Sequence, residues 1–335
     1  WPVEHRRSMH RAGVLALDST VIEKPNVVVV ILESFSAAFS KRLNGGEDCM
    51  PFLDSLMSEG LSFPRAYANG RRSIDGIPAI TASIPEWMDE AFITSPYAQA
   101  PFTALGGLLG SQGYSTSFYH GGRNGTMGFD TYASAAGYQR YVGMDQYPEP
   151  DDYDGTWGIR DRPFLHFFAQ EMSKERQPFH SVVFTLSSHH PYHLPDGEAK
   201  RFGEGKHRIE PTLRYADDAL CRFFSEARKE SWFDNTLFVI TADHTADLDR
   251  SGQHYSEATD YWVPLVFYWP KVLPARASPH VAQHIDILPT VLDLIGFDEP
   301  FFSMGSSVAS GEGRGMAVAR SMGFWFAFMA EGNFC

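Results

Sequence analysis

The sequence lacks the features that mark disulfide-rich, nucleic-acid-binding and membrane-spanning proteins. Its three cysteines, at positions 49, 221 and 335, are far apart, which excludes a disulfide framework and a zinc-ligand spacing. The formal net charge of −13 argues against a nucleic-acid partner, because such proteins usually carry a basic face. No apolar run approaches the roughly 20 residues of a membrane helix, and no signal peptide is recognisable.

What the sequence does have is a large apolar fraction. Of its 335 residues, 43% are hydrophobic and 14% aromatic, which suits one large α/β domain with a small appendage. The chain begins at Trp1 without Met, so we expect it to be part of a longer protein. We expect residues 1–25 to lead in from an upstream region, residues 26–300 to form the main domain, and residues 301–335 to pack on it.

Apolar runs predict a parallel sheet covered by helices. Residues 27–32, 180–186 and 237–240 are rich in β-branched and other apolar side chains, as in strands buried on both faces. Strands that alternate with helices predict a mostly parallel sheet flanked by helices. The aromatic tail at residues 323–329 suggests an edge strand or a packing segment. Helical spacing or helix-end signals are found in residues 51–60, 102–113, 155–172, 215–225 and 284–296.

Charged side chains and imidazoles follow directly after each of the three buried strands. They are Glu33 after the first, His189 and His190 after the next, and Asp243 and His244 after the last. Because ligands bind beyond the carboxyl ends of parallel strands, these residues should meet at one rim, where they suit Mn²⁺, Mg²⁺ or Zn²⁺. The alternatives are a helix cap for Glu33 and an ordinary solvent-facing exit for Asp243 and His244.

The segment 69–78 places Ser73 beside Arg71 and Arg72 at an expected helix start. A guanidinium fork and a helix N-terminus both bind anionic oxygens, so Ser73 is a candidate nucleophile for an anionic ester. The alternative is that Ser73 caps the helix and the arginines are solvated; Thr81 and Ser83 are the other candidate nucleophiles. Farther along, a glycine-rich loop at 119–129 carries His120, Arg123 and Asn124, and an acidic segment at 144–156 is a candidate lid.

Six motifs resemble the lipoteichoic acid synthase-like phosphoglycerol transferases of the sulfatase/alkaline phosphatase superfamily. They occur in the family's order and span nearly the whole chain. The resemblance implies the superfamily's central, mostly parallel sheet flanked by helices, with a small C-terminal appendage. The motifs are residues 26–35, 51–56, 67–73, 187–191, 242–245 and 284–290.

The resemblance also implies the chemistry of the site. Glu33, Asp243 and His244 match the family's metal ligands for one divalent cation, with Mn²⁺ favoured over Mg²⁺ or Zn²⁺. Ser73 matches the nucleophile, which also touches the metal and is Thr in the lipoteichoic acid synthases. His189 matches a phosphate-binding histidine. Family members transfer phosphoglycerol from phosphatidylglycerol through a covalent phospho-enzyme, and Arg72 would hold the donor phosphate beside the metal.

Substrates and location follow from the same resemblance. The donor would be a phospholipid head group, the acceptor a glycan or glycerol phosphate of the cell envelope, and the domain would lie outside the cytoplasm, after inner-membrane helices of a bacterial protein. The family's glycerol-binding Asp, Trp and Arg are absent, since this loop has Gly122, Met127 and Phe129. The residues expected to contact substrate instead are His120, Arg123, Asn124 and His190.

Three other functions are compatible with parts of this pattern. A sulfatase needs Pro and Arg two and four residues after its modified Ser or Cys, whereas Ser73 is followed there by Asp75 and Ile77. A phosphoethanolamine transferase or phosphodiesterase would use the same core with another head group. A catalytically silent extracellular binding domain would bind no metal, and the complete set of candidate ligands speaks against it.

Overall fold

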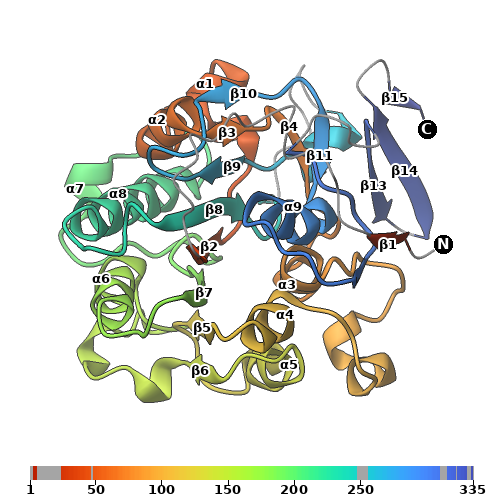
Figure 1. The fold of residues 1–335 in the computed structure, drawn as a ribbon. Helices are drawn as coiled ribbons and strands as arrows, with labels where there is room; N and C mark the ends of the chain where they lie inside the picture. Colours follow the sequence, from red (N-terminus) through yellow and green to blue (C-terminus); the bar gives the residue numbers. More distant parts are fainter. Residues whose placement is uncertain are drawn as a thin grey trace.

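The protein, seen here as a computed structural model, is built around one eight-stranded sheet (Figure 1). The structure describes residues 3–5, 24–46, 48–246, 256–309, 315–321, 323–329 and 333–334. The strands, in sheet order, are β10 (Arg276–Ala277), β3 (Leu61–Ser62), β9 (Leu265–Tyr268), β8 (Thr236–Ala242), β2 (Asn26–Leu32), β7 (Phe179–Phe184), β5 (Ser115–His120) and β6 (Arg140–Val142).

The centre of the sheet is parallel, as the sequence predicts. Strand β2 pairs in parallel with β8 on one side and β7 on the other, and β7, β5 and β6 continue in the same direction. Only β9 runs against its neighbours β8 and β3. The three strands expected to carry the site are therefore adjacent, with their carboxyl ends at one rim.

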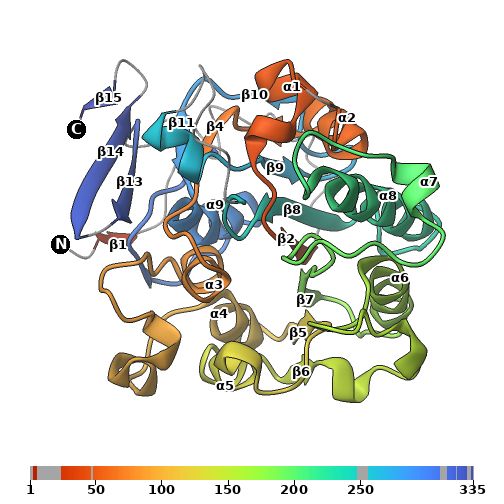
Figure 2. The same ribbon diagram turned by 180° about the vertical axis from the view of Figure 1, so that it is seen from behind.

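Helices cover both faces of the sheet (Figures 1 and 2). Within the described residues, no helix combines the length and apolarity needed to cross a bilayer. One face carries α2 (Pro51–Glu59), α6 (Asp161–Met172) and α8 (Glu210–Ala227), and the other carries α3 (Ser73–Ala82), α4 (Leu105–Ser111), α5 (Phe129–Ala135) and α9 (Ile287–Leu294); α1 (Lys41–Asn44) and α7 (Ala199–Phe202) are short.

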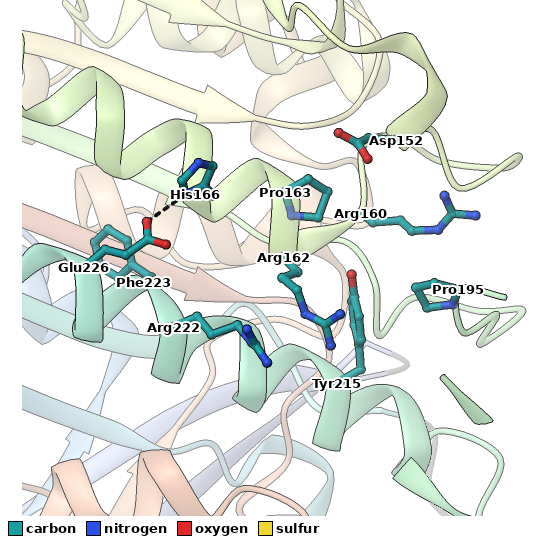
Figure 3. A pocket seen from close by; sticks show the side chains of 10 residues that line it. All are labelled: Asp152, Arg160, Arg162, Pro163, His166, Pro195, Tyr215, Arg222, Phe223 and Glu226. Carbon is teal, nitrogen blue, oxygen red and sulfur yellow. Dashed lines mark hydrogen bonds and ion pairs between the residues drawn. The ribbon is translucent and has the colours of Figure 1, made fainter. Parts of the chain in front are cut away.

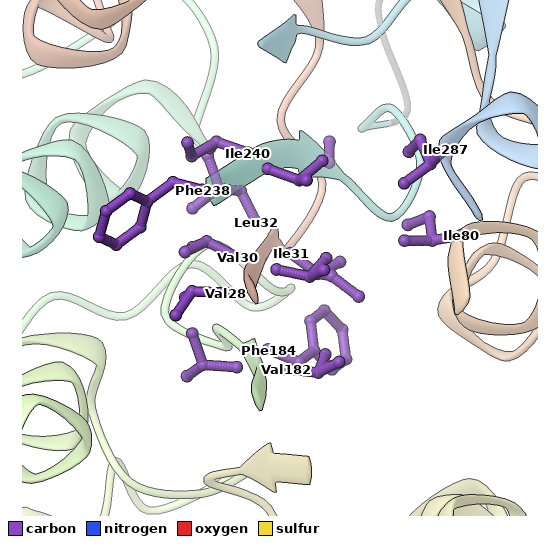
Figure 4. Close-up of a cluster of buried hydrophobic side chains, with 14 of the residues drawn as sticks. Val28, Val30, Ile31, Leu32, Ile80, Val182, Phe184, Phe238, Ile240 and Ile287 are labelled. Carbon is purple, nitrogen blue, oxygen red and sulfur yellow. The ribbon is translucent and has the colours of Figure 1, made fainter. Parts of the chain in front are cut away.

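Strand β2 is the centre of the hydrophobic core (Figure 4). Every residue from 27 to 32 is fully buried, because helices pack against both of its faces. Val30 and its register partner Ile240 lie on one side, while Ile31 lies toward Ile80 of α3 and Ile287 of α9 on the other. Branched side chains on both faces leave no place for charge until the strand ends at Glu33.

A buried carboxylate from α8 caps the start of α2. The two oxygens of Asp217 accept hydrogen bonds from the backbone N–H groups of Phe52 and Leu53, at 2.8 and 2.9 Å. The residue at the N-cap position, Met50, supplies no side-chain bond of its own. Asp217 therefore fastens α2 to α8 through backbone groups that would otherwise be buried without a partner.

Asp217→Ala should lower the free energy of unfolding by about 2 kcal/mol, because it leaves the buried N–H of Leu53 and the partly buried N–H of Phe52 unpaired. Urea denaturation would measure the loss. Glu226→Ala is the matched control on the same helix, since Glu226 pairs only with the half-exposed His166 and should change stability by less than about 0.5 kcal/mol. Equal losses in the two variants would contradict this role of Asp217.

The same carboxylate predicts a pH dependence of stability. Burial raises the pKa of Asp217 from 3.8 to about 7, and the two backbone N–H groups only partly oppose it. The folded chain then keeps a proton that the unfolded chain releases, so the contribution of Asp217 is complete below about pH 4 and is lost as pH rises through 7. Between pH 5 and 8, Asp217→Asn should lose less stability than the wild type in thermal denaturation; parallel curves would contradict the prediction.

The C-terminal region forms a small sheet beside the main domain. Strand β14 (Phe324–Met329) lies between β13 (Met316–Ser321) and β15 (Asn333–Phe334), so it is the central strand of its sheet and not an edge strand. The alternative of a packing segment agrees with Phe328, which is buried and stacks on Tyr67. Asn69 donates a hydrogen bond to the carbonyl of Val318 in β13 at 2.7 Å, which connects the small sheet to the main domain. Two further pairs complete the fold: β1 (Val3–His5) with β12 (Phe301–Ser303), and β4 (Arg65–Tyr67) with β11 (Val281–Gln283).

Candidate active site

Four side chains meet at the rim where β2 and β8 end. They are Glu33, Asp243, His244 and, from the first turn of α3, Ser73; we refer to them as the rim group. One ligand atom from each of Glu33, Asp243 and His244 lies within 4.8 Å of the other two. The structure thus brings together all four residues expected at the metal.

Asp243 has one satisfied oxygen and one that is free. Its Oδ1 accepts hydrogen bonds from the backbone N–H groups of Ser34 and His244, both at 2.8 Å. Its Oδ2 is buried and has no hydrogen-bond partner in the described part of the chain, and it lies 3.3 Å from Nε2 of His244. An unpaired buried carboxylate oxygen is costly unless a cation binds it.

The imidazole of His244 directs its Nε2 toward the unpaired Oδ2 of Asp243. Its Nδ1 donates to the carbonyl of Thr245 at 2.8 Å, so in the neutral ring the lone pair is on Nε2. That nitrogen lies 3.6 Å from Oε1 of Glu33 and 3.5 Å from Oγ of Ser73. Two carboxylates and one imidazole directed at one point are a donor set that fits a divalent cation.

Glu33 is buried, and backbone bonds fix the chain on either side of its side chain. Its N–H donates to Oγ1 of Thr185 at 3.0 Å, and its carbonyl accepts from Oγ of Ser188 at 2.5 Å. Burial and the neighbouring carboxylate of Asp243 raise the pKa of Glu33 well above its ordinary value. A bound cation would oppose both effects, which is a second sign that the rim group fits a metal.

Ser73 is the first residue of α3 and does not cap it. Arg72 holds the N-cap position, whereas Oγ of Ser73 donates to Oε2 of Glu33 at 3.3 Å, so the capping interpretation of Ser73 is wrong. A Cβ atom on Gly76 would lie 2.2 Å from the carbonyl oxygen of Asp243. Only glycine lets the first turn of α3 approach the metal-ligand strand this closely.

Arg72 is held beside Ser73, the candidate nucleophile, by a buried carboxylate. Its Nε and one terminal nitrogen donate to Asp75 at 2.7 and 3.2 Å, while 53% of its side chain stays exposed. The bond to Asp75 raises the pKa of Arg72. Arg71 pairs with Asp260 at 3.5 Å. The expectation that the arginines are merely solvated therefore fails for both.

His189 is placed by a carbonyl that also binds a tryptophan. Its Nδ1 donates to the carbonyl of His190 at 2.7 Å, and the indole N–H of Trp157 donates to the same oxygen at 2.6 Å. The two rings pack with centroids 4.1 Å apart. Burial lowers the pKa of His189, which leaves Nε2 unprotonated at neutral pH. His190 itself is exposed and contacts Tyr192.

We expect Trp157→Phe to reduce kcat about tenfold with little change in metal affinity, because Phe keeps a ring against His189 but loses the hydrogen bond that orients it. Steady-state kinetics and calorimetric metal titration would measure the two quantities. Trp269→Phe is the matched control, since this buried tryptophan lies behind β9. An unchanged kcat in Trp157→Phe would show that His189 needs no such support.

The three residues of the glycine-rich loop that were expected to contact substrate lie in two different environments. His120 is buried, stacked on Phe184 with centroids 5.2 Å apart, and burial lowers its pKa to about 3. Arg123 lies over the ring of Tyr153, and Asn124 donates to Gln146. His120 thus has an aromatic environment, whereas the other two side chains contact the segment 144–156.

Several supporting residues were not anticipated from the sequence. Oδ1 of Asp161 accepts hydrogen bonds from the N–H groups of Leu186 and Ser187, at 2.7 and 3.1 Å, and so shapes the turn that carries His189. Burial raises the pKa of Asp161 to about 6. Thr185 and Ser188 adjoin a strand end and could have been suspected there. Asp161 is at the start of a helix and carries no such signal.

The other candidate nucleophiles have structural partners. Thr81 donates to the carbonyl of Ile77 within α3, and Ser83 donates to the carbonyl of Ile285, both at 2.7 Å. A cavity of about 460 Å³ between α6 and α8 is also separate from the rim group (Figure 3). Two of its arginines, Arg162 and Arg222, are paired with Asp218.

The fold and the rim group define an α/β protein with a candidate metal centre beside a serine. The sulfatase family matches residues 25–297, and the chain belongs to that family, within the alkaline phosphatase superfamily. It is therefore an enzyme, and it is similar to lipoteichoic acid synthase-like proteins, as the motifs indicated. The prediction of a mostly parallel sheet flanked by helices is confirmed.

Individual relatives agree with this placement. The chain is 23% identical over 322 residues to the lipoteichoic acid synthase-like YvgJ of Bacillus subtilis, covering 89% of this chain and 52% of that protein. It is 26% identical over 312 residues to lipoteichoic acid synthase 1 of the same organism, covering 85% and 48%. The chain thus spans about half the length of these relatives.

Solved structures show the same fold. An alkaline phosphatase superfamily protein from Vibrio parahaemolyticus superposes with a TM-score of 0.81 at 30% identity, covering 92% of this chain and 75% of that one. The lipoteichoic acid synthase LtaP of Listeria monocytogenes superposes with a TM-score of 0.75 at 18% identity, covering 96% and 90%.

Proposed function

We propose that the chain is the catalytic domain of a metal-dependent transferase that moves phosphoglycerol from phosphatidylglycerol to a cell-envelope acceptor. The observation that carries the proposal is the position of Ser73, whose hydroxyl lies at a helix N-terminus and within 3.5 Å of both Glu33 and His244. Relatives named lipoteichoic acid synthases support phosphoglycerol as the group transferred. The domain would act outside the cytoplasm of a bacterium.

The rim group would hold one divalent cation, with Mn²⁺ favoured. When bound, the cation would lower the pKa of the Ser73 hydroxyl and offset charge on the phosphoryl oxygens. The N-terminus of α3 and the guanidinium of Arg72 add positive charge on the same side. These groups favour a phosphoryl group as the substrate's reacting part.

The reaction would have two displacements. In the first, Oγ of Ser73 forms a bond to phosphorus, and the serine proton moves to the Glu33 oxygen that already accepts it. The bond from phosphorus to the diacylglycerol oxygen breaks, and that oxygen takes up a proton from solvent. Glu33 returns its proton to Ser73 when the second displacement releases the serine. In the second, an acceptor hydroxyl attacks the same phosphorus and releases Ser73. His189, with Nε2 unprotonated, would accept the proton of that hydroxyl.

Mass spectrometry of the trapped intermediate tests the proposal. Trypsin cleavage after Arg72 gives a peptide that runs from Ser73 to Arg123, the next basic residue. After incubation with phosphatidylglycerol and Mn²⁺, that peptide should carry phosphoglycerol on its first residue, and chelation before incubation should prevent it. A phosphoethanolamine adduct from phosphatidylethanolamine would instead identify another head group, and an adduct on Thr81 or Ser83 would refute Ser73.

A further inference from the structure

Four large aromatic side chains are exposed in or near the small C-terminal sheet and β12. Trp87 and Trp325 are each 45% exposed, Phe302 is 40% exposed and Phe324 is 70% exposed. The rings of Trp87 and Trp325 lie 4.9 Å apart, and the indole N–H of Trp87 reaches the sulfur of Met304, two residues after Phe302. We refer to Trp87, Phe302, Phe324 and Trp325 as the aromatic patch.

The elements that carry the patch are close in space although distant in sequence. Phe302 is in β12, which pairs with β1, and Phe324 and Trp325 begin β14. In both views, β1, β13 and β14 lie together at one side of the main sheet (Figures 1 and 2). Exposed aromatic side chains that cluster, as those of Trp87 and Trp325 do, usually mark a binding surface on a protein with an otherwise complete core.

The patch borders the loop that carries the nucleophile. Glu86, directly before Trp87, donates its N–H to the carbonyl of Asn69 at 3.0 Å. Burial and Asp75 raise the pKa of Glu86 to about 7, while the charges of Arg72 and Arg320 oppose that rise. Arg320 is the register partner of Trp325 in the small sheet. Glu86 therefore lies between the arginine beside Ser73 and the strands of the patch.

We propose that the aromatic patch inserts into the interfacial region of a lipid bilayer, so that a phospholipid head group reaches Ser73 while its acyl chains stay in the membrane. The inference rests on the proposed function, because it takes a diacyl lipid as the donor. Aromatic rings at a protein surface, indole rings above all, partition into the zone where head groups meet acyl chains.

The charge of the chain favours this mode of attachment over electrostatic adhesion. With a net charge of −13, the chain is repelled by anionic lipid surfaces, so buried aromatic area has to supply the attraction. Binding by apolar insertion is insensitive to salt, whereas binding by basic residues weakens as ionic strength rises.

Flotation of the full chain with vesicles tests the patch without relying on turnover. Vesicles of phosphatidylcholine should bind the wild type equally well at about 0.1 and about 0.5 M salt, and added phosphatidylglycerol, which is anionic, should not strengthen binding at either salt concentration. The double variant Phe324→Ser/Trp325→Ser and the single variant Trp87→Ser should each bind at least about fivefold more weakly. Tyr97→Ser is the matched control, because Tyr97 is 64% exposed in a short helix, residues 96–99, that packs on α5.

Activity measurements separate failure of the patch from failure of the proposed function. With a soluble aryl ester of glycerol phosphate, the patch variants should turn over as the wild type does, whereas vesicle-embedded phosphatidylglycerol should react at least about fivefold more slowly. If the patch variants turn over vesicle-embedded phosphatidylglycerol as fast as the wild type does, the proposed role of the aromatic patch is wrong and the proposed function stands. Patch-dependent vesicle binding without turnover of either substrate would overturn only the proposed function.

Sedimentation measures whether the exposed aromatic side chains join two copies of the chain instead of binding lipid. If the wild type fails to bind vesicles and instead self-associates, and if Phe324→Ser/Trp325→Ser makes it monomeric, the surface joins two copies of the chain and the lipid proposal is wrong. Far-ultraviolet circular dichroism of each variant establishes that the small sheet remains folded, and Trp87→Ser gives an independent reading from outside that sheet.

Discussion

Ser73→Ala is expected to lower donor turnover by roughly three orders of magnitude or more, without loss of stability. The change removes one hydroxyl whose contacts are with the carboxylate of Glu33 and the imidazole of His244, at 3.3 and 3.5 Å, and not with the helix backbone. No bond to phosphorus could then form at this position. Initial rates with phosphatidylglycerol and a thermal melt of the same preparation would measure both effects.

Two further variants sharpen this prediction. Ser73→Thr keeps a hydroxyl at the position, so it should retain measurable turnover and still form the adduct. Ser83→Ala is the matched control: Ser83 bonds the carbonyl of Ile285 and the hydroxyl of Ser303, so the variant should lose stability and keep its chemistry. Full activity in Ser73→Ala would remove Ser73 from the mechanism and leave the fold assignment intact.

Asp243→Asn should weaken Mn²⁺ binding by more than the 10- to 100-fold that changes around a metal's ligands typically cause. The amide can still accept both backbone hydrogen bonds through its oxygen, but it replaces the unpaired Oδ2 with an uncharged nitrogen. The metal would then lose a charged ligand while the turn after β8 keeps its shape. Calorimetric titration of the metal-free chain would measure the affinity.

Thermal denaturation gives a second readout of the same site. A metal that binds only the folded chain, at 100 times its Kd, stabilises it by about 2.7 kcal/mol. Adding Mn²⁺ should therefore raise the melting temperature of the wild type and of Asp217→Asn, whose altered carboxylate is at α2, but not that of Asp243→Asn. A similar rise in Asp243→Asn would place the metal elsewhere.

The sequence was most informative where one local pattern decides the structure. The short, β-branched run at 27–32 strongly favours a strand buried on both faces, and the charged residue that follows such a strand emerges where the strand ends. The same reasoning located Asp243 and His244, because both adjoin a strand end. The convergence of these residues then follows from parallel pairing, which places neighbouring carboxyl ends together.

The supporting contacts could not be predicted because they join segments that the sequence keeps apart. Trp157 meets His189 through the carbonyl of His190, and Asp161 binds the turn after β7, yet neither lies in a recognisable pattern. The central position of β14 in its sheet depends on partners on both sides, which no single-strand periodicity reveals. These features depend on contacts between segments distant in sequence, which local propensity does not reveal.

Asn69 connects the small C-terminal sheet to the loop that carries Ser73, although the two are far apart in sequence. This buried side chain, four residues before Ser73, bonds Gln283 and Val318 through its amide nitrogen and the N–H of Ile285 through its oxygen. A domain shortened before β13 would retain every residue of the rim group and still lose one brace of the nucleophile's loop. Boundaries for expressing or engineering this enzyme should therefore lie beyond β13, although the sulfatase match ends at residue 297.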